Sequence, residues 1–369
     1  MSLRERCRAV LSGLTLLVAL PCGAAQVTLS LGSIQHPIFE AEGVTVVFDT
    51  VKHGTADIRL DRLRVAREEY RNLRVHCAGF FFDGRQLDCP EGTVRRENDR
   101  RKSPEDASGR ERPALPFSFA WRAQDGFLSF SMHDVDAVAF SPLVKRLRGW
   151  QPQGTIDFGL TVEGDKAWLG LALRDLAFAS KEGDVSGKAI LLTLAGNAER
   201  RNGVWQWHAR LDWPQGELYR APWRRAAGVI MTAEGSLTPT VLEVSLAQLN
   251  VAGTGGVTAS MRWDRVLGEA TDWGFITDEI DLASAMREWV QPWLSGLGFP
   301  KWHAAGHARF SAEWKAGSLH RFYAGLDGAQ LADSTGYVEL GGVNAQVPWE
   351  DSTPTDASIS VAAGRLGDL

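Results

Sequence analysis

The sequence is poor in the residues and motifs on which most catalytic and redox sites depend. It holds 4 cysteines, 4 tyrosines and 8 histidines in 369 residues. It contains no H-E-x-x-H pair and no G-x-S-x-G elbow, and its glycine-rich stretch at 253–256 lacks the Lys-Ser/Thr pair of a phosphate-binding loop. These absences predict a protein that is not an enzyme and that uses no cofactor.

A metal site is equally poorly supported. His303 and His307 lie four residues apart, but the intervening Ala304–Gly306 predicts a loop that leads into a strand. Zinc needs three or four converging ligands, and the sequence around this pair offers no others, so we predict no metal site. An enzyme that acts on envelope glycan or lipid stays an alternative, because a pair of carboxylates for glycoside hydrolysis is not recognisable in one sequence.

The chain also lacks an excess of positive charge. Its formal net charge is −5 and its pI is about 5.9, which argues against a nucleic-acid partner. Its content of 44% hydrophobic and 23% charged residues lies in the globular range and excludes disorder of the whole chain.

Long apolar runs are missing beyond the N-terminus. Residues 1–25 combine three arginines with a short apolar run, 9–20, and with small residues at Gly23–Ala25. That run is shorter than the roughly 20 residues that span a bilayer, so we predict a cleaved signal peptide and a periplasmic location. Retention of the segment as an inner-membrane anchor is the alternative.

Two of the four cysteines, Cys7 and Cys22, belong to this N-terminal segment. The other two, Cys77 and Cys89, lie on either side of a turn at Phe82–Arg85. In an oxidising compartment such a pair predicts a disulfide between neighbouring strands.

Alternation of apolar and polar residues dominates the remaining sequence. Residues 155–162, 204–213 and 242–246 each place apolar side chains on one face of a strand and polar ones on the other. Because glycine, aspartate and asparagine separate many such segments, we predict an all-β, antiparallel protein with a few short helices.

Two predicted helices interrupt the strands and reveal a repeat. One covers 141–150; the other covers 281–294, with Asp281 as N-cap and a kink or end near Pro292. Each leads into a similar strand, at 154–165 and 306–317. We therefore predict an N-terminal β region at 26–140, a first helix-led unit at 141–280 and a second at 281–369, the last incomplete at its C-terminal end. Residues 95–113, rich in both signs of charge, predict a solvated loop, with contact to anionic lipid headgroups as the alternative.

Units of this kind that follow one another predict an elongated sheet. If it curls without closing, its apolar face becomes a long apolar trough; if it closes, the same residues fill a β-sandwich. Our candidates for the groove are apolar residues on three of the predicted strands: Ile156, Phe158, Leu160, Val162, Trp205, Trp207, Leu211, Phe310 and Trp314.

Together these features resemble a family, the AsmA-like proteins of Gram-negative bacteria, particularly the TamB and YdbH type. The similarity lies in the basic, apolar N-terminus, the alternating strands, the two helix-to-strand junctions and the cysteines around the hairpin turn. The resemblance implies an elongated, curled sheet that forms an open, U-shaped groove. This hydrophobic groove would carry phospholipid between the inner and outer membranes and serve outer-membrane assembly. Its implied partners are acyl chains, the two membranes and envelope proteins. The alternative is a non-catalytic structural or interaction β-sandwich of the cell envelope.

Overall fold

The computed structural model describes residues 26–36, 39–49, 54–65, 68–96, 114–140, 150, 152–221, 223–252, 254–351, 353 and 355–366. The predicted signal peptide at 1–25 and the helix predicted for 141–150, except Trp150, lie outside these residues. So does most of the charged loop predicted for 95–113, although Arg95 and Arg96 belong to a strand.

The described residues are mostly strand. The N-terminal strands are β1 (Gln26–His36), β2 (Phe39–Asp49), β3 (Gly54–Val65), β4 (Glu68–Phe82), β5 (Gln86–Arg96), β6 (Leu115–Arg122) and β7 (Phe127–Asp136), followed by the 3₁₀ turn η1 (Ala137–Phe140). The middle strands are β8 (Gln153–Glu163), β9 (Lys166–Ala179), β10 (Val185–Arg201), β11 (Val204–Arg220), β12 (Trp223–Ala226), β13 (Val229–Leu237), β14 (Val241–Val251), β15 (Gly255–Asp264) and β16 (Glu269–Thr277). The C-terminal elements are β17 (Ile280–Asp281), α2 (Leu282–Ala285), the π-helical turn η3 (Met286–Val290), α3 (Gln291–Gly296), β18 (Trp302–Lys315), β19 (Ser318–Asp333), β20 (Val338–Glu350) and β21 (Ser358–Leu366).

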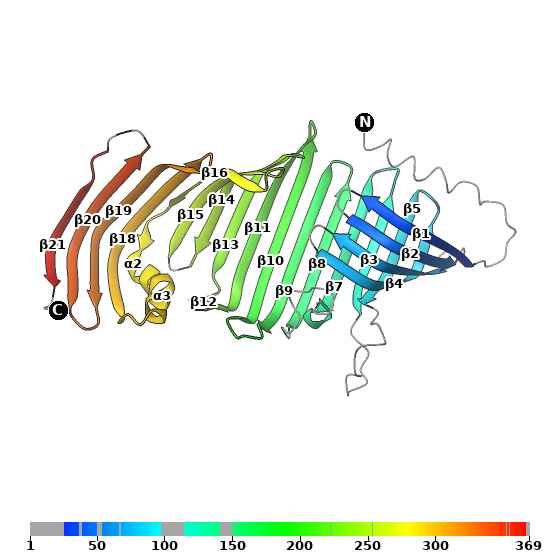
Figure 1. Cartoon of the computed structure of the whole chain (residues 1–369), viewed down its shortest axis with the longest axis horizontal. Coiled ribbons are helices and arrows are strands. Elements are labelled where there is room, and N and C mark those ends of the chain that lie inside the picture. The colour runs from blue at the N-terminus through cyan, green and yellow to red at the C-terminus, as the bar shows by residue number, and fades with distance from the viewer. Residues whose placement is uncertain are drawn as a thin grey trace.

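All 21 strands belong to one sheet, and every pairing is antiparallel. Each strand pairs with the next along the chain, except that β11 pairs with both β12 and β13, and β18 with both β16 and β17. Figure 1 shows the result, a long open band whose two ends lie far apart. At about 4.8 Å between strands, the ladder without the short β12 and β17 extends over about 90 Å.

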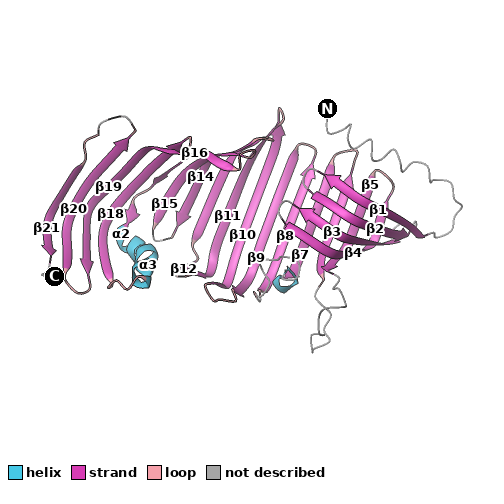
Figure 2. Cartoon of the chain, viewed as in Figure 1, coloured by secondary structure: helices cyan, strands magenta, loops and turns pink. Residues whose placement is uncertain are grey.

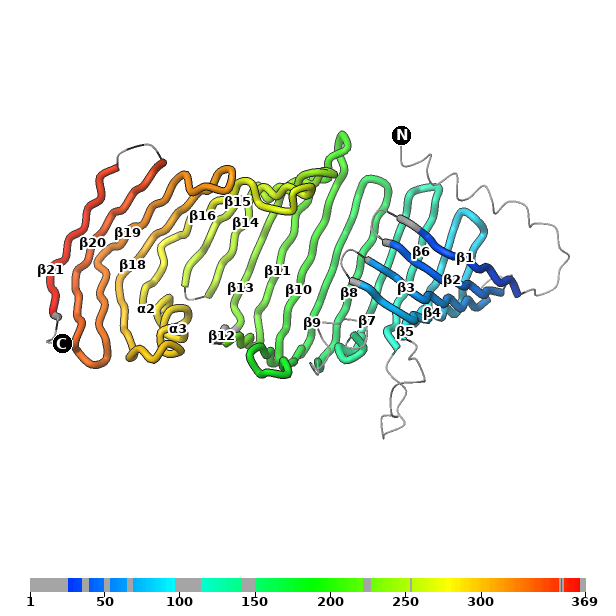
Figure 3. The backbone as a smooth tube through the Cα atoms, in the orientation of Figure 1, coloured from blue at the N-terminus to red at the C-terminus, as the bar shows by residue number. Residues whose placement is uncertain are grey.

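The all-β, antiparallel prediction is confirmed, but the predicted curl into a U-shaped groove is wrong. The sheet is open and uncurled, and from β9 to β21 it forms a single twisted layer (Figure 3). The sequence pattern could not distinguish these shapes, because alternation fixes which side chains share a face but not the curvature of the sheet. The sheet also continues through the predicted boundaries, since β7 pairs with β8 and β17 with β18.

The most completely buried side chains lie near the N-terminal end of the sheet. A disulfide joins Cys77 on β4 to Cys89 on β5, with Cα atoms 5.6 Å apart, inside a cluster that contains Ala56 and Phe80. A second cluster surrounds Val135, which is 1% exposed. The sheet is therefore most firmly packed between β2 and β8.

The two predicted repeats share a local distortion of their strands. Gly154 on β8 and Gly306 on β18 both have a left-handed φ, +99° and +92°, next to a shift in strand register. A Cβ at either position would lie 2.6–2.7 Å from the backbone of the following strand, so glycine is required at both. The helix of the first repeat lies outside the described residues, so the repeated helix-then-strands unit stays a prediction.

The second predicted helix is present, at one edge of the sheet between β12 and β18 (Figure 2). The Asp281 carboxylate caps it by accepting a hydrogen bond from the Ser284 N–H at 2.7 Å, as predicted. Pro292 lies in the first turn of α3, directly after the π-helical turn η3. A proline has no N–H to donate, which matches the break in the regular helix at this point.

We predict that reduction of the Cys77–Cys89 bond destabilises the N-terminal part of the sheet. The bond closes a loop with a sequence separation of 12. Such a cross-link lowers the conformational entropy of the unfolded chain, which stabilises the folded state by about 3 kcal/mol. Urea unfolding with and without reductant measures this difference. The double variant Cys77→Ala, Cys89→Ala is the control, and its urea midpoint should be the same with and without reductant. Equal midpoints for the oxidised and reduced wild type would contradict the prediction.

Candidate functional site

The strand register places all nine groove candidates on one face of the sheet. One unbroken row of directly paired residues crosses the sheet from β5 to β20, and every member of it is apolar or glycine. The row consists of Cys89, Phe119, Phe130, Leu160, Leu169, Gly196, Ala209, Ala233, Ala247, Ala259, Phe275, Ala312, Phe322 and Trp349. We call the face that contains this row the apolar face and its opposite the polar face.

The candidates lie in this row or an even number of residues from it. Leu160 is a member, and its strand neighbours Ile156, Phe158 and Val162 share its face because side chains alternate along a strand. On β11, Trp205, Trp207 and Leu211 flank Ala209 in the same way. On β18, Phe310 and Trp314 flank Ala312. The structure therefore brings candidates from three distant segments onto one surface.

The apolar face is neither a sealed core nor fully exposed. All nine candidates are half-buried. From β13 onward the buried apolar residues are alanines and one valine: Ala233, Val251, Ala308, Ala312, Ala329 and Ala345. Larger side chains beside them stay accessible, such as Trp273 at 38% and Trp349 at 41%. The small residues are thus buried by larger neighbours on the same face, and the larger side chains stay accessible. This is expected where no second layer of described residues covers the face.

Aromatic rings pack against one another along this face. Trp273 on β16 stacks on Trp314 on β18, with ring centroids 3.7 Å apart and planes 4° from parallel. Nearer the N-terminus, Phe130 lies between Phe117 and Phe158, at 5.8 and 6.0 Å. Phe158 packs against the buried cluster around Val135 and so supports the fold as well as the face.

Trp207 faces a glycine on the next strand. Its partner in the register is Gly235, and a Cβ there would approach the indole to 3.0 Å. The indole N–H of Trp207 is buried and has no hydrogen-bond partner among the described residues. Trp213, where the pairing of β11 with β13 ends, instead donates to the Gln215 carbonyl at 2.9 Å.

The polar face is held by ion pairs between strands. Asp157 on β8 forms an ion pair with Arg174 on β9 and accepts a hydrogen bond from the Asp134 N–H at 2.8 Å. Asp134 has a left-handed φ of +50°, so this carboxylate supports a strained residue at the β7 bulge. The Asp134 N–H, and then the Arg174 guanidinium, hold the pKa of Asp157 below its usual range.

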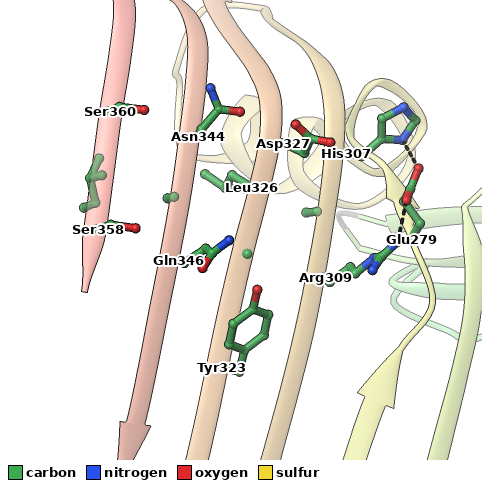
Figure 4. A pocket seen from close by; sticks show the side chains of 14 residues that line it. Glu279, His307, Arg309, Tyr323, Leu326, Asp327, Asn344, Gln346, Ser358 and Ser360 are labelled. Carbon is green, nitrogen blue, oxygen red and sulfur yellow. Dashed lines mark hydrogen bonds and ion pairs between the residues drawn. The ribbon is translucent and has the colours of Figure 1, made fainter. Parts of the chain in front are cut away.

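A cavity of about 480 Å³ lies on the polar face across β18 to β21 (Figure 4). At one end of it Glu279 forms ion pairs with His307 at 3.2 Å and with Arg309 at 2.7 Å. Tyr323, Asn344 and other polar residues of the following strands complete its lining. The sequence offered no signal for this cavity, because its residues are the polar members of ordinary alternating strands.

The predicted loop before His307 is wrong, since Ala304–Gly306 belong to β18 and the extra residue is absorbed by a bulge. His307 pairs with Glu279, and His303 has no such partner in the part of the chain that the structure describes. No group of three or more metal-ligating side chains occurs among the described residues. Within the same residues, no helix has the length and apolar character needed to cross a membrane.

Comparisons with protein-family models, with curated proteins and with solved structures found no match to this chain. The geometry of the two faces is therefore the basis on which a function is proposed.

We predict that Asp157 makes stability depend on acid pH. Because its pKa is lower in the folded protein, its contribution is complete above its ordinary pKa of about 3.9 and is lost as pH falls through the lower folded value. The thermal midpoint of the wild type should therefore fall between neutral and strongly acid pH. In Asp157→Asn it should fall less, because the contribution of the Asp157 carboxylate is missing at every pH. Glu182→Gln, in an exposed turn, should leave the decline as in the wild type; the same decline in Asp157→Asn would contradict the prediction.

Proposed function

We propose that this chain is an AsmA-like protein of the periplasm and that its apolar face binds phospholipid acyl chains during transfer between membranes. The observation that supports this function best is the unbroken apolar row from Cys89 on β5 to Trp349 on β20. From β9 onward no second layer of described residues covers this row (Figure 3), and an uncovered apolar surface of this length is unusual for a protein that remains alone in water.

The open sheet changes the form of the predicted path. Acyl chains would lie on one face of a twisted band instead of inside a U-shaped groove, with headgroups toward its polar rim. Each CH₂ group that the face removes from water contributes about 0.8 kcal/mol, so binding needs no specific polar contact. Buried alanines alternate on this face with larger, partly exposed side chains, over which extended hydrocarbon would pack.

The alternative, a solid structural β-sandwich, agrees less well with the fold. A sandwich needs a second sheet about 10 Å from the first, with large side chains buried between them. Beyond β13 the large side chains of the apolar face are half-exposed, and the buried ones are almost all alanine. We further propose that the protein performs no chemical step, in line with the motifs that its sequence lacks.

The helical segment 282–296 and the turn after it provide a surface suited to a bilayer. Exposed apolar residues gather there: Trp289, Val290, Trp293, Leu297 and Phe299, at 39–57% exposure. Tryptophan prefers the boundary between headgroups and acyl chains, because its ring is apolar and its N–H is polar. Contact at this edge of the sheet would bring a leaflet next to the apolar face.

We predict that a charge placed on the apolar face stops lipid transfer. Ala259→Asp puts a carboxylate into the middle of the row on β15, where an acyl chain would have to bury it. Transfer of a fluorescent phospholipid between vesicles should fall about tenfold or more, since burial of an unpaired charge costs well above 1.4 kcal/mol. Mass spectrometry of the purified protein should show bound phospholipid in the wild type and less in this variant.

The neighbouring Ser260→Asp is the matched control, because the same charge then faces the polar side, where Ser260 is exposed. It should transfer lipid as the wild type does. Absence of bound phospholipid from the wild type, together with equal transfer by both variants, would exclude the proposed function.

We also predict that Trp293 and Phe299 mediate membrane contact. The double variant Trp293→Ala, Phe299→Ala should bind sedimented phosphatidylethanolamine–phosphatidylglycerol vesicles at least about tenfold more weakly, because two large apolar side chains no longer leave water. Trp168→Ala removes an equally exposed ring, at 42%, from the polar face and should bind normally. Equal loss in both variants would show that the helical segment has no special role.

A further inference from the structure

The cavity on the polar face of β18 to β21 is built from two parallel rows of paired residues. The first row contains Arg309, Gly325, Gln346 and Ser358, one from each strand. The second pairs His307 with Asp327, and Asn344 with Ser360. Figure 4 shows these side chains on one side of the four strands, with Tyr323 at the lower end of the view.

Tyr323 lies over its own strand instead of standing away from it. A Cβ on Gly325 would be 2.8 Å from the Tyr323 hydroxyl oxygen and 3.1–3.2 Å from two ring carbons, so the ring occupies the space that glycine leaves. The hydroxyl end of the ring thus lies above Gly325, because residues two apart on a strand share a face. Figure 4 shows the Tyr323 ring from one of its faces, beside the other residues that line the cavity.

Polar groups around this ring are available to a ligand. Within the described part of the chain, the side chains of Tyr323, Gln346, Ser358 and Ser360 make no hydrogen bond. Asn344 is held in place instead, because its Oδ1 accepts from the Gly328 N–H at 2.9 Å. The cavity thus presents a mixture of amide, hydroxyl and carboxylate groups in a fixed array.

The charges favour a neutral ligand. The guanidinium of Arg309 is already paired with Glu279, whose pKa is lowered chiefly by this hydrogen bond. Asp327 adds a carboxylate that has no cation within ion-pair distance among the described residues, so a phosphate or sulfate would meet repulsion. A flat aromatic ring beside amides and carboxylates suits the apolar face and the hydroxyl groups of a sugar ring.

We propose that this cavity binds a neutral oligosaccharide, with one sugar ring stacked on Tyr323 and its neighbours hydrogen-bonded to Gln346, Asp327 and Ser358. The cavity extends over four strands, or about 14 Å at 4.8 Å per interval, which is longer than a single sugar ring. The site lies on the face opposite the proposed lipid path, so neither proposal depends on the other.

Binding of chitotetraose, maltotetraose and cellotetraose to the whole protein tests this inference. At least one of the three should give saturable shifts of side-chain amide signals, including that of Gln346, in NMR titrations up to about 10 mM. Tyr323→Ala should weaken that binding about tenfold, and Tyr323→Phe should retain most of it because the ring remains. Failure of all three sugars to bind at about 10 mM would overturn the proposal.

Tyr337→Ala is the matched control, since Tyr337 is 55% exposed in the turn before β20 and outside the cavity. It should bind the sugar as the wild type does. Unchanged affinity in Tyr323→Ala, with circular dichroism like that of the wild type, would also overturn the proposal.

A free glycan and the sugar headgroup of a glycolipid share this chemistry. Vesicles that contain glucosyl diacylglycerol distinguish them, because they should compete with the bound tetrasaccharide only if a membrane-attached sugar can reach the cavity. Competition supports the site and assigns a lipid-linked source, and its absence supports the site with a free source. Lipid transfer measured on Tyr323→Ala should equal that of the wild type.

Discussion

The structure depends on one constraint, the phase of side-chain alternation, which must be kept from strand to strand. A slip of one residue in any pairing would turn the apolar residues of that strand to the other face. Several strands contain an extra residue, yet the phase survives because each extra residue is absorbed in a bulge. On β14, for example, Val244 pairs with Gly235 and Ala247 with Ala233, so two intervening residues face one. Pro90, which cannot donate to a ladder, lies within such a bulge between β5 and β6.

A sheet built under this constraint acquires two faces with different physical roles. The polar face is stabilised by ion pairs that link strands, such as Asp157 with Arg174 and Arg321 with Glu350. On the apolar face, aromatic rings and alanines partly bury one another, but a single layer cannot bury them fully. Among the residues that the structure describes, the larger buried clusters lie near the disulfide, between β2 and β8. Hydrocarbon that covers the remainder of the apolar face would remove it from water, which lowers the free energy of the system.

Much of this arrangement could be predicted from the sequence, because alternation is a local property. The strands around Trp207 and Phe158, the Asp281 cap and the turn at Asp83 all follow from neighbouring residues. The absence of curl and the bulge before His307 could not be predicted, since they depend on twist and on register between strands. The Tyr323 cavity was also missed: its members come from four strands, and the ring position depends on space left by Gly325.

In the proposed function, the apolar face of the sheet contacts lipid and the polar face does not. Single-cysteine variants at Gln206, Trp207, His208 and Ala209 on β11, labelled with an environment-sensitive fluorophore, test it residue by residue. With phospholipid vesicles present, labels at Trp207 and Ala209 should shift to the emission of an apolar environment, and labels at Gln206 and His208 should remain as in water. Equal responses at all four positions would show that the two faces do not differ in their contact with lipid.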